Sequence, residues 1–246
     1  MKINNHFLIP IVTGVSMLPT SAAMLLYTSG HGDMGIAYDA GALDPHVHIH
    51  DGSVVDGMTI NNPPDGMEYA PDEILTLVAD PSTPRAAGTQ WAFIGSPVSS
   101  PVWVLPQNQD PDRPFYGVAS EELDPADWTS LSFSLVTMAA PAGGNFSFYD
   151  TDGFGTPTVR FATSDGIDGA DSWLLNVGGH DHANFAFTEP GIYALTFTVD
   201  GVHVLDGAKT ATATYYFSVA PVPEPASALL TLPLLGLLAR RRRATA

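Results

Sequence analysis

Apolar and polar residues alternate along several short segments of this chain. Leu131, Phe133 and Leu135 are separated by serines, and apolar residues occupy every second position from Tyr193 to Val199. A period of two is typical of a β-strand that buries one face. The predicted strands, each bounded by Gly, Pro, Asn or Asp, are 35–38, 46–50, 74–78, 102–105, 131–138, 145–149, 158–162, 183–188, 191–199 and 210–219.

Strands of this kind, without a helical period between residues 23 and 220, predict an all-β fold in one domain. Residues 52–72 and 79–127 are rich in loop-forming residues, and several prolines between Pro101 and Pro114 disfavour a central strand there. We therefore expect an antiparallel β-sandwich, Ig-like or jelly-roll-like, with long loops.

The first 22 residues have the pattern of a signal peptide. Lys2 precedes the apolar stretch 7–18, and small residues follow at 20–23. This order suits export and cleavage by signal peptidase. We expect a helical signal peptide over 1–22 and a mature body that begins near residue 23.

The last 26 residues, 221–246, form a second apolar segment with basic residues after it. The apolar run 226–239 would reach only about 21 Å as a helix, which is short for a bilayer core of about 30 Å. The cluster that follows is Arg240, Arg241, Arg242 and Arg243. Arginines at this place hold that end on the cytoplasmic side. We expect transient membrane insertion, with an ordinary transmembrane anchor as the alternative.

Pro223, Glu224 and Pro225, followed by the apolar run and the arginines, resemble the PEP-CTERM sorting signal. The resemblance implies recognition by an exosortase-type membrane transpeptidase in a Gram-negative bacterium. It also implies a protein of the cell envelope or the extracellular space, either anchored or released.

The chain is strongly acidic, with a formal net charge of −17. Between residues 23 and 225 only four basic residues stand against 26 acidic ones, which leaves about −22 for the body. Such a surface repels nucleic acid and concentrates cations. The chain has no cysteine, so any metal site must use histidine and carboxylate ligands.

Five histidines fall in two short clusters. They are His46, His48 and His50 in the first cluster and His180 and His182 in the second. Side chains two apart on a strand share one face at a spacing of about 6.5 to 7 Å. If the two strands face each other, their imidazoles could hold zinc or copper at about 2.0 to 2.1 Å.

Further candidate ligands or outer-shell partners lie beside these histidines. They are His31, Asp33, Asp51 and Asp181. The alternative is a set of solvated histidines that bond to neighbouring carboxylates. His203 stands apart and is expected on the surface.

The histidine segments also carry a second resemblance. The stretches 31–33 with Tyr38, 46–51, 69–71, 102–107, 179–187 and 190–193 are similar, in the same order, to the choice-of-anchor M domain. That family is similar to the surface-anchored repeat domain of actinobacteria. The resemblance implies an exported β-rich domain whose members exchange one C-terminal anchor for another. The actinobacterial relatives occur beside transporters of the metal-uptake type, so the resemblance favours metal binding. This chain departs from them at Phe185, where they often carry Trp.

Other kinds of site find less support. The Asp-Gly segments 150–153 and 165–169 lack the terminal Glu of a calcium loop and are typical of turns, so calcium is disfavoured. The sequence contains no nucleophile with a partner base, and Glu121 and Glu122 are expected in a solvated loop. We therefore expect no enzyme.

Together these patterns predict an exported, surface-directed, non-enzymatic β-sandwich that binds zinc or copper through histidines. The alternative is a structural or adhesive protein of the extracellular matrix, in contact with exopolysaccharide, whose histidines bind no metal.

Overall fold

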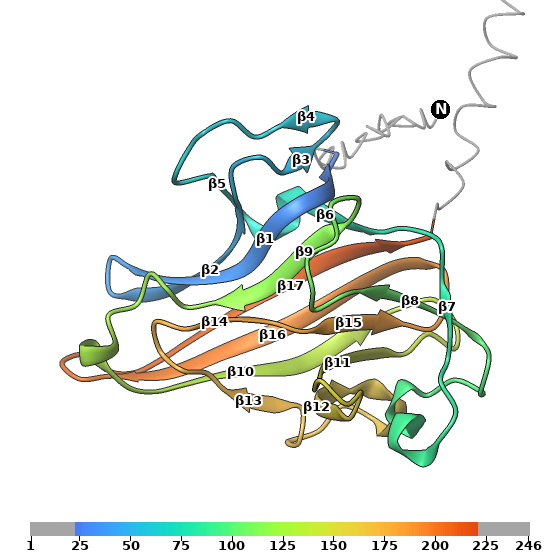
Figure 1. The fold of residues 1–246 in the computed structure, drawn as a ribbon. Coiled ribbons are helices and arrows are strands. Elements are labelled where there is room, and N and C mark those ends of the chain that lie inside the picture. Colours follow the sequence, from blue (N-terminus) through green and yellow to red (C-terminus); the bar gives the residue numbers. More distant parts are fainter. Residues whose placement is uncertain (1–22, 221–246) are drawn as a thin grey trace, which may run out of the picture.

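The computed structural model describes residues 23–220, which are built almost entirely from β-strands (Figure 1). The predicted signal peptide and sorting segment lie outside these residues. In chain order the strands are β1 (Leu25–Asp39), β2 (Ala42–Ile49), β3 (Val54–Val55), β4 (Met58–Thr59), β5 (Met67–Tyr69), β6 (Ile74–Val78), β7 (Thr83–Pro84), β8 (Pro101–Leu105), β9 (Pro114–Ala119), β10 (Trp128–Ala139), β11 (Phe146–Thr151), β12 (Pro157–Ala162), β13 (Ser172–Leu174), β14 (His180–His182), β15 (Asn184–Phe187), β16 (Gly191–His203) and β17 (Gly207–Val219). The 3₁₀ helices are η1 (Pro71–Glu73), η2 (Thr89–Ile94), η3 (Pro125–Asp127) and η4 (Thr163–Asp165). Within residues 23–220, no helix has the length and apolar character needed to cross a membrane.

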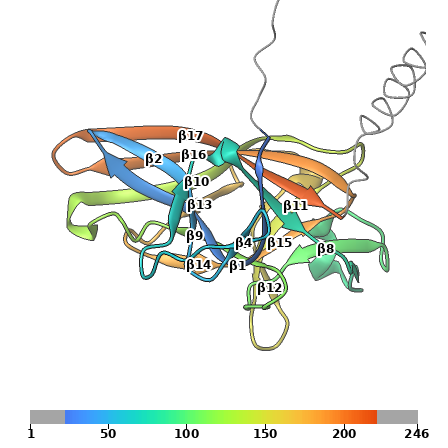
Figure 2. The same ribbon diagram turned by 90° about the horizontal axis from the view of Figure 1, so that it is seen from above.

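Two sheets form a sandwich-like arrangement, so the predicted all-β fold is confirmed. The larger sheet follows the order β13-β10-β16-β17-β6-β1-β2-β5, and β9 and β14 branch from β1. The smaller sheet has the order β12-β11-β15-β8-β7. Figure 2 shows β8, β11 and β15 of the smaller sheet gathered at one end of the molecule.

Aromatic side chains from both sheets fill the core. Phe133 and Phe217 of the larger sheet pack against Phe161 and Phe185 of the smaller one, at ring distances of 6.2 and 5.9 Å respectively. All four are at most 1% exposed. Burying one such side chain stabilises the fold by about 1.5–3 kcal/mol, and the alternation seen in the sequence follows from this burial.

The pairing is mostly antiparallel, but three pairs are parallel. These are β1 with β6, β1 with β9, and β6 with β17. Long connections precede each parallel partner, as parallel pairing requires.

All ten predicted strands overlap observed strands, three of them extending past the observed ends by one residue at one or both ends. The prediction that 79–127 is rich in loops was wrong at one important place. The strand β9 lies in this region, between β1 and β14. Its proline, Pro114, occupies the first position and is paired with Gly30 of β1. A proline at the first position of a strand need not interrupt the hydrogen-bond ladder. β9 can therefore begin at Pro114 despite the prolines that precede it.

Candidate metal centre

Four neighbouring strands, β2, β1, β9 and β14, bring distant parts of the chain side by side (Figure 1). Asp33 of β1 is paired with His48 on one side and with Gly117 of β9 on the other, and Gly117 is paired with His182 of β14. Directly paired residues project to the same face of a sheet. Asp33, His48 and His182 therefore share one face.

The opposite face of these strands belongs to the core. Val47, Met34 and Val118 alternate with the polar residues and are at most 2% exposed. Their burial sets the register, because a slip by one residue would send the polar residues into the core. The apolar residues thus determine where the histidines point.

The imidazoles of His31, His180 and His182 converge beside the carboxylate of Asp33. Nε2 of His31 lies 3.0 Å from Nε2 of His182 and 3.3 Å from Nε2 of His180. The Asp33 carboxylate lies 2.9 Å from Nε2 of His180 through Oδ1 and 3.3 Å from Nε2 of His31 through Oδ2. One ligand atom from each of the four residues lies within 4.8 Å of the others. Four ligands bound tetrahedrally at about 2.0–2.1 Å would lie about 3.3 Å apart, close to these separations.

Three ring nitrogens at this distance cannot all be satisfied by one another. A neutral imidazole has one donor and one acceptor nitrogen, so a pair of Nε2 atoms can share only one proton. A cation between them would accept all three lone pairs and would also neutralise Asp33. We call His31, Asp33, His180 and His182 the inner cluster.

Burial and hydrogen bonding shift the pKa values within the inner cluster. Burial alone would raise the pKa of Asp33, but hydrogen bonds from His180, His31 and His50 hold it well below its usual range. The hydrogen bond to Asp33 raises the pKa of His180. Burial lowers the pKa of His182 to about 4. Asp33 and His182 therefore carry the charge states that metal ligands need at neutral pH.

Further side chains hold the inner cluster in place. His50 places Nε2 2.9 Å from Oδ2 of Asp33 and stacks on His31 at 3.9 Å. Oε2 of Glu121 lies 3.4 Å from Nδ1 of His180, the nitrogen that faces away from the cluster. The Phe115 ring stacks on His182 at 3.5 Å. Such outer partners orient metal-binding imidazoles in known sites.

Gly117 leaves the space that the cluster uses. A Cβ atom at this position would lie 2.5 Å from Oδ1 of Asp33 and 2.9 Å from the carbonyl oxygen of Asp181. Any larger residue would therefore displace the carboxylate or the neighbouring strand.

A second group of ligand-type side chains lies farther along β2. His46, His48 and Glu122 each offer one atom within 4.8 Å of the others. Nε2 of His46 lies 3.0 Å from Oε1 of Glu122. We call these three residues the outer cluster.

The structure divides the nine predicted metal-site residues into four sets. His31, Asp33, His180 and His182 come together, His50 bonds to Asp33, and His46 and His48 belong to the outer cluster. The remaining two are apart from both clusters. Asp51 accepts the backbone N–H of Asn62, and Asp181 is exposed between the two histidines of β14.

The expectation that His203 lies on the surface was wrong. Its side chain is buried, stacks on Tyr38 at 4.9 Å and accepts the backbone N–H groups of Leu205 and Asp206 through Nδ1. It therefore closes the β16–β17 turn.

Sequence reasoning missed the contacts of Glu121 and Glu122. Both are partly exposed, as expected of a loop, but each faces a histidine of one cluster. Their place directly after β9 could have indicated this only if β9 had been recognised.

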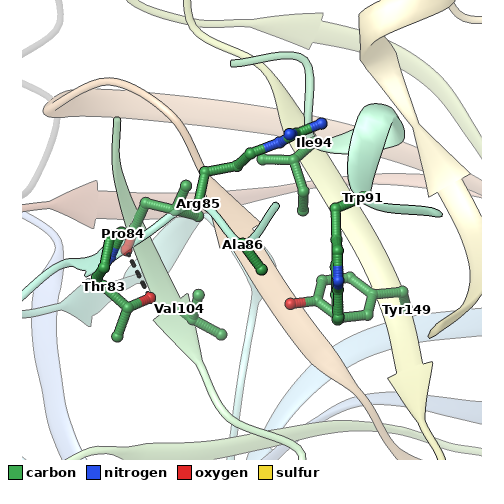
Figure 3. Close-up of a pocket in the computed structure, with 9 residues that line it drawn as sticks. Thr83, Pro84, Arg85, Ala86, Trp91, Ile94, Val104 and Tyr149 are labelled. Atoms are coloured by element: carbon green, nitrogen blue, oxygen red, sulfur yellow. Dashed lines mark hydrogen bonds between the residues drawn. The ribbon is translucent and has the colours of Figure 1, made fainter. Parts of the chain in front are cut away.

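A separate pocket lies in the other sheet, between β7, β8 and η2 (Figure 3). Trp91 and Tyr149 meet there edge to face at 5.8 Å, and Arg85 is the one charged residue in its lining. The lining of this pocket contains no histidine and no carboxylate, so it offers no chemistry comparable to that of the histidine clusters.

Comparisons with protein-family models, curated proteins and solved structures find no match for this chain. The resemblances to the PEP-CTERM signal and to the choice-of-anchor M domain therefore stay predictions from the residues that carry them.

Proposed function

We propose that this protein captures a transition-metal ion, zinc or copper(II), through the inner cluster at the cell surface. The observation that carries the proposal is the convergence of three Nε2 atoms beside a buried carboxylate. Nε2 of His31 lies 3.0 Å from that of His182 and 3.3 Å from that of His180, and the Asp33 carboxylate lies 2.9, 3.3 and 4.0 Å from Nε2 of His180, His31 and His182 respectively. Solvated side chains that only form hydrogen bonds would not need to direct their ligand atoms toward one common point.

The ligand types select the class of metal. Three imidazoles and one carboxylate suit zinc, copper and their neighbours, whereas calcium and magnesium prefer sets made only of oxygen. The four ligands come from β1 and β14, which are separated by about 150 residues of sequence. Metal binding would therefore also link two distant parts of the fold.

The number of ligands favours capture over catalysis. Catalytic zinc sites keep a position open for water, and structural or storage sites fill all four positions with protein atoms. Asp33 is completely buried, and the histidines around it are at most 27% exposed in their side chains. A closed set of ligands suits a protein that holds an ion.

Isothermal titration of residues 23–220 with zinc and with copper(II) tests this proposal. We expect tight binding at neutral pH and loss of this binding at about pH 5, because imidazoles become protonated there. His182→Ala should remove the tight phase, and Asp181→Asn, an exposed neighbour on the same strand, should leave it unchanged. Absence of tight binding in the unaltered protein would overturn metal capture and leave the matrix or adhesion role.

We further propose that the body reaches the surface through its terminal segments. Support comes from the sequence alone, namely the apolar segment 7–18 and the Pro223-Glu224-Pro225 tail with its arginines. Cell fractionation of a Glu224→Ala variant in a host with an exosortase-type enzyme tests it. We expect the variant to keep its tail, whereas equal processing of both proteins would count against the sorting signal.

A further inference from the structure

The outer cluster has a different place in the fold from the inner one. His46 and His48 come from β2, and Glu122 comes from the turn after β9. The His50 ring separates the clusters, since it stacks on His48 at 4.5 Å and on His31 at 3.9 Å. The two groups therefore have no ligand in common.

His46 has a buried nitrogen without a partner. Its Nδ1 lies 3.1 Å from the carbonyl oxygen of Asp44 and must donate to it, so Nε2 carries the lone pair in the neutral ring. The residue is only 6% exposed, and Nε2 has no hydrogen-bond partner among the described residues. A buried acceptor of this kind costs free energy unless something binds it.

The Glu122 carboxylate faces this nitrogen without hydrogen-bond geometry. The two atoms are 3.0 Å apart, yet they form no hydrogen bond. With the His46 ring neutral, its lone pair and the carboxylate oxygen repel each other at this distance, but both would bind one cation. This is the relation between two ligands of a metal ion.

His48 can supply a third ligand atom. Its Nε2 lies 2.6 Å from the carbonyl oxygen of Asp65 and must donate to it, which leaves the lone pair on Nδ1. The other ring nitrogen of each histidine is thus held by a backbone carbonyl, an arrangement that fixes ring orientation in metal sites.

Gly35 provides the space for His46. The two residues are paired across β1 and β2, and a Cβ atom at position 35 would lie 2.3 Å from Nε2 of His46. The imidazole therefore lies over the glycine and directs Nε2 toward the turn that carries Glu122.

We propose that His46, His48 and Glu122 form a second, weaker site for the same class of metal ion. The inference deepens the proposed function and rests on it. The outer site has three protein ligands, one of which is the Glu122 carboxylate with a side chain that is 39% exposed. The inner site has four, one of which is the buried Asp33 carboxylate. Because it has fewer ligands and greater exposure, the outer site should bind its ion more weakly and exchange it faster than the inner site.

Adjacent glutamates offer a matched pair of variants. Glu121 contacts His180 of the inner cluster, and Glu122 contacts His46 of the outer one. Both substitutions to Ala remove the same charge from the same exposed turn. Their effects on folding should be similar, but their effects on zinc should differ.

Zinc stoichiometry of the full chain, purified in mild detergent, tests the second site by equilibrium dialysis at neutral pH. We expect two ions, with the second bound at least tenfold more weakly and released first by a chelator. Glu122→Ala and His48→Ala should each reduce the count to one. Glu121→Ala should keep two ions, but with the tighter one bound about tenfold more weakly, because His180 loses an outer partner. His182→Ala should keep only the weaker ion.

One tight ion in the unaltered chain, with no change in Glu122→Ala, would overturn the second site and leave the proposed function standing. No bound ion in any variant would overturn both. Loss of both ions in Glu122→Ala with an unchanged thermal unfolding curve would also overturn two separate sites, because it would mean one shared centre.

Discussion

Asp33 is a buried negative charge in an acidic protein, and its neighbours explain how the fold tolerates it. It is 0% exposed, and His31, His50 and His180 all lie within 3.3 Å of its oxygens. A buried carboxylate without partners would cost several kcal/mol. Imidazoles on three sides supply hydrogen bonds, and a bound cation would supply the missing positive charge.

Gly117→Ala should weaken zinc binding at the inner cluster by about tenfold or more, which corresponds to about 1.4 kcal/mol. The reason is the 2.5 Å approach of the new Cβ to Oδ1 of Asp33. Competition titration with a zinc chelator measures the change. Gly153→Ala is the matched control, since a Cβ there meets nothing within 4 Å. Equal affinity in both variants would contradict the role given to Gly117.

Without metal, the stability of the fold should decrease as the pH falls from about 6.5 to about 4 because of His182. Its pKa is depressed to about 4 in the folded state, so the unfolded chain takes up the proton first and acid favours unfolding. His180 has a raised pKa and adds stability that is fully present below 6.5, so it does not change within this window. Urea unfolding with a chelator present should give a flatter pH dependence for His182→Gln, and an unchanged slope would contradict this assignment.

At the scale of elements, the edge strand β14 and the central strand β1 depend on β9. β9 pairs with β1 in parallel over six residues and with β14 over three. Among the described strands, β14 pairs only with β9. The pairing of β9 with both strands therefore places His180 and His182 of β14 next to His31 of β1. A local change in this strand would therefore separate the two halves of the inner cluster.

The β16–β17 hairpin should lose stability in His203→Ala while zinc binding stays unchanged. His203 accepts two backbone N–H groups in the turn and packs against Tyr38 and Trp128. Leaving those donors unpaired should cost about 1–3 kcal/mol. Chemical denaturation and zinc titration of the same sample separate the two effects. A fall in zinc affinity at constant folding would mean that His203 also influences the metal site.

At the scale of the molecule, binding at the inner cluster should raise the thermal stability of the whole fold. An ion that binds only the folded state adds about 2.7 kcal/mol at 100 times its dissociation constant. For a domain of this size the corresponding rise in Tm is about 5–11 °C. Differential scanning calorimetry with and without zinc measures it, and Asp33→Asn should abolish the rise. A rise of equal size in Asp33→Asn would place the stabilising ion elsewhere.

The sequence by itself determined the all-β class, the ten strands with strict alternation or β-branched runs, and the histidine types that suit a transition metal. It also pointed to His31 and Asp33 beside the two clusters. These features are local, because side-chain period and ligand chemistry depend on neighbours in the chain.

Only the tertiary structure decided how the candidates group. The parallel pairing of β1 with β9 separates the histidines into an inner and an outer cluster and gives Glu121 to one and Glu122 to the other. The tertiary structure also buries His203, which was expected on the surface because it stands apart from the histidine clusters in the sequence. Pairing between strands far apart in sequence depends on the packing of the whole core, and no local period records which strand becomes the neighbour of another.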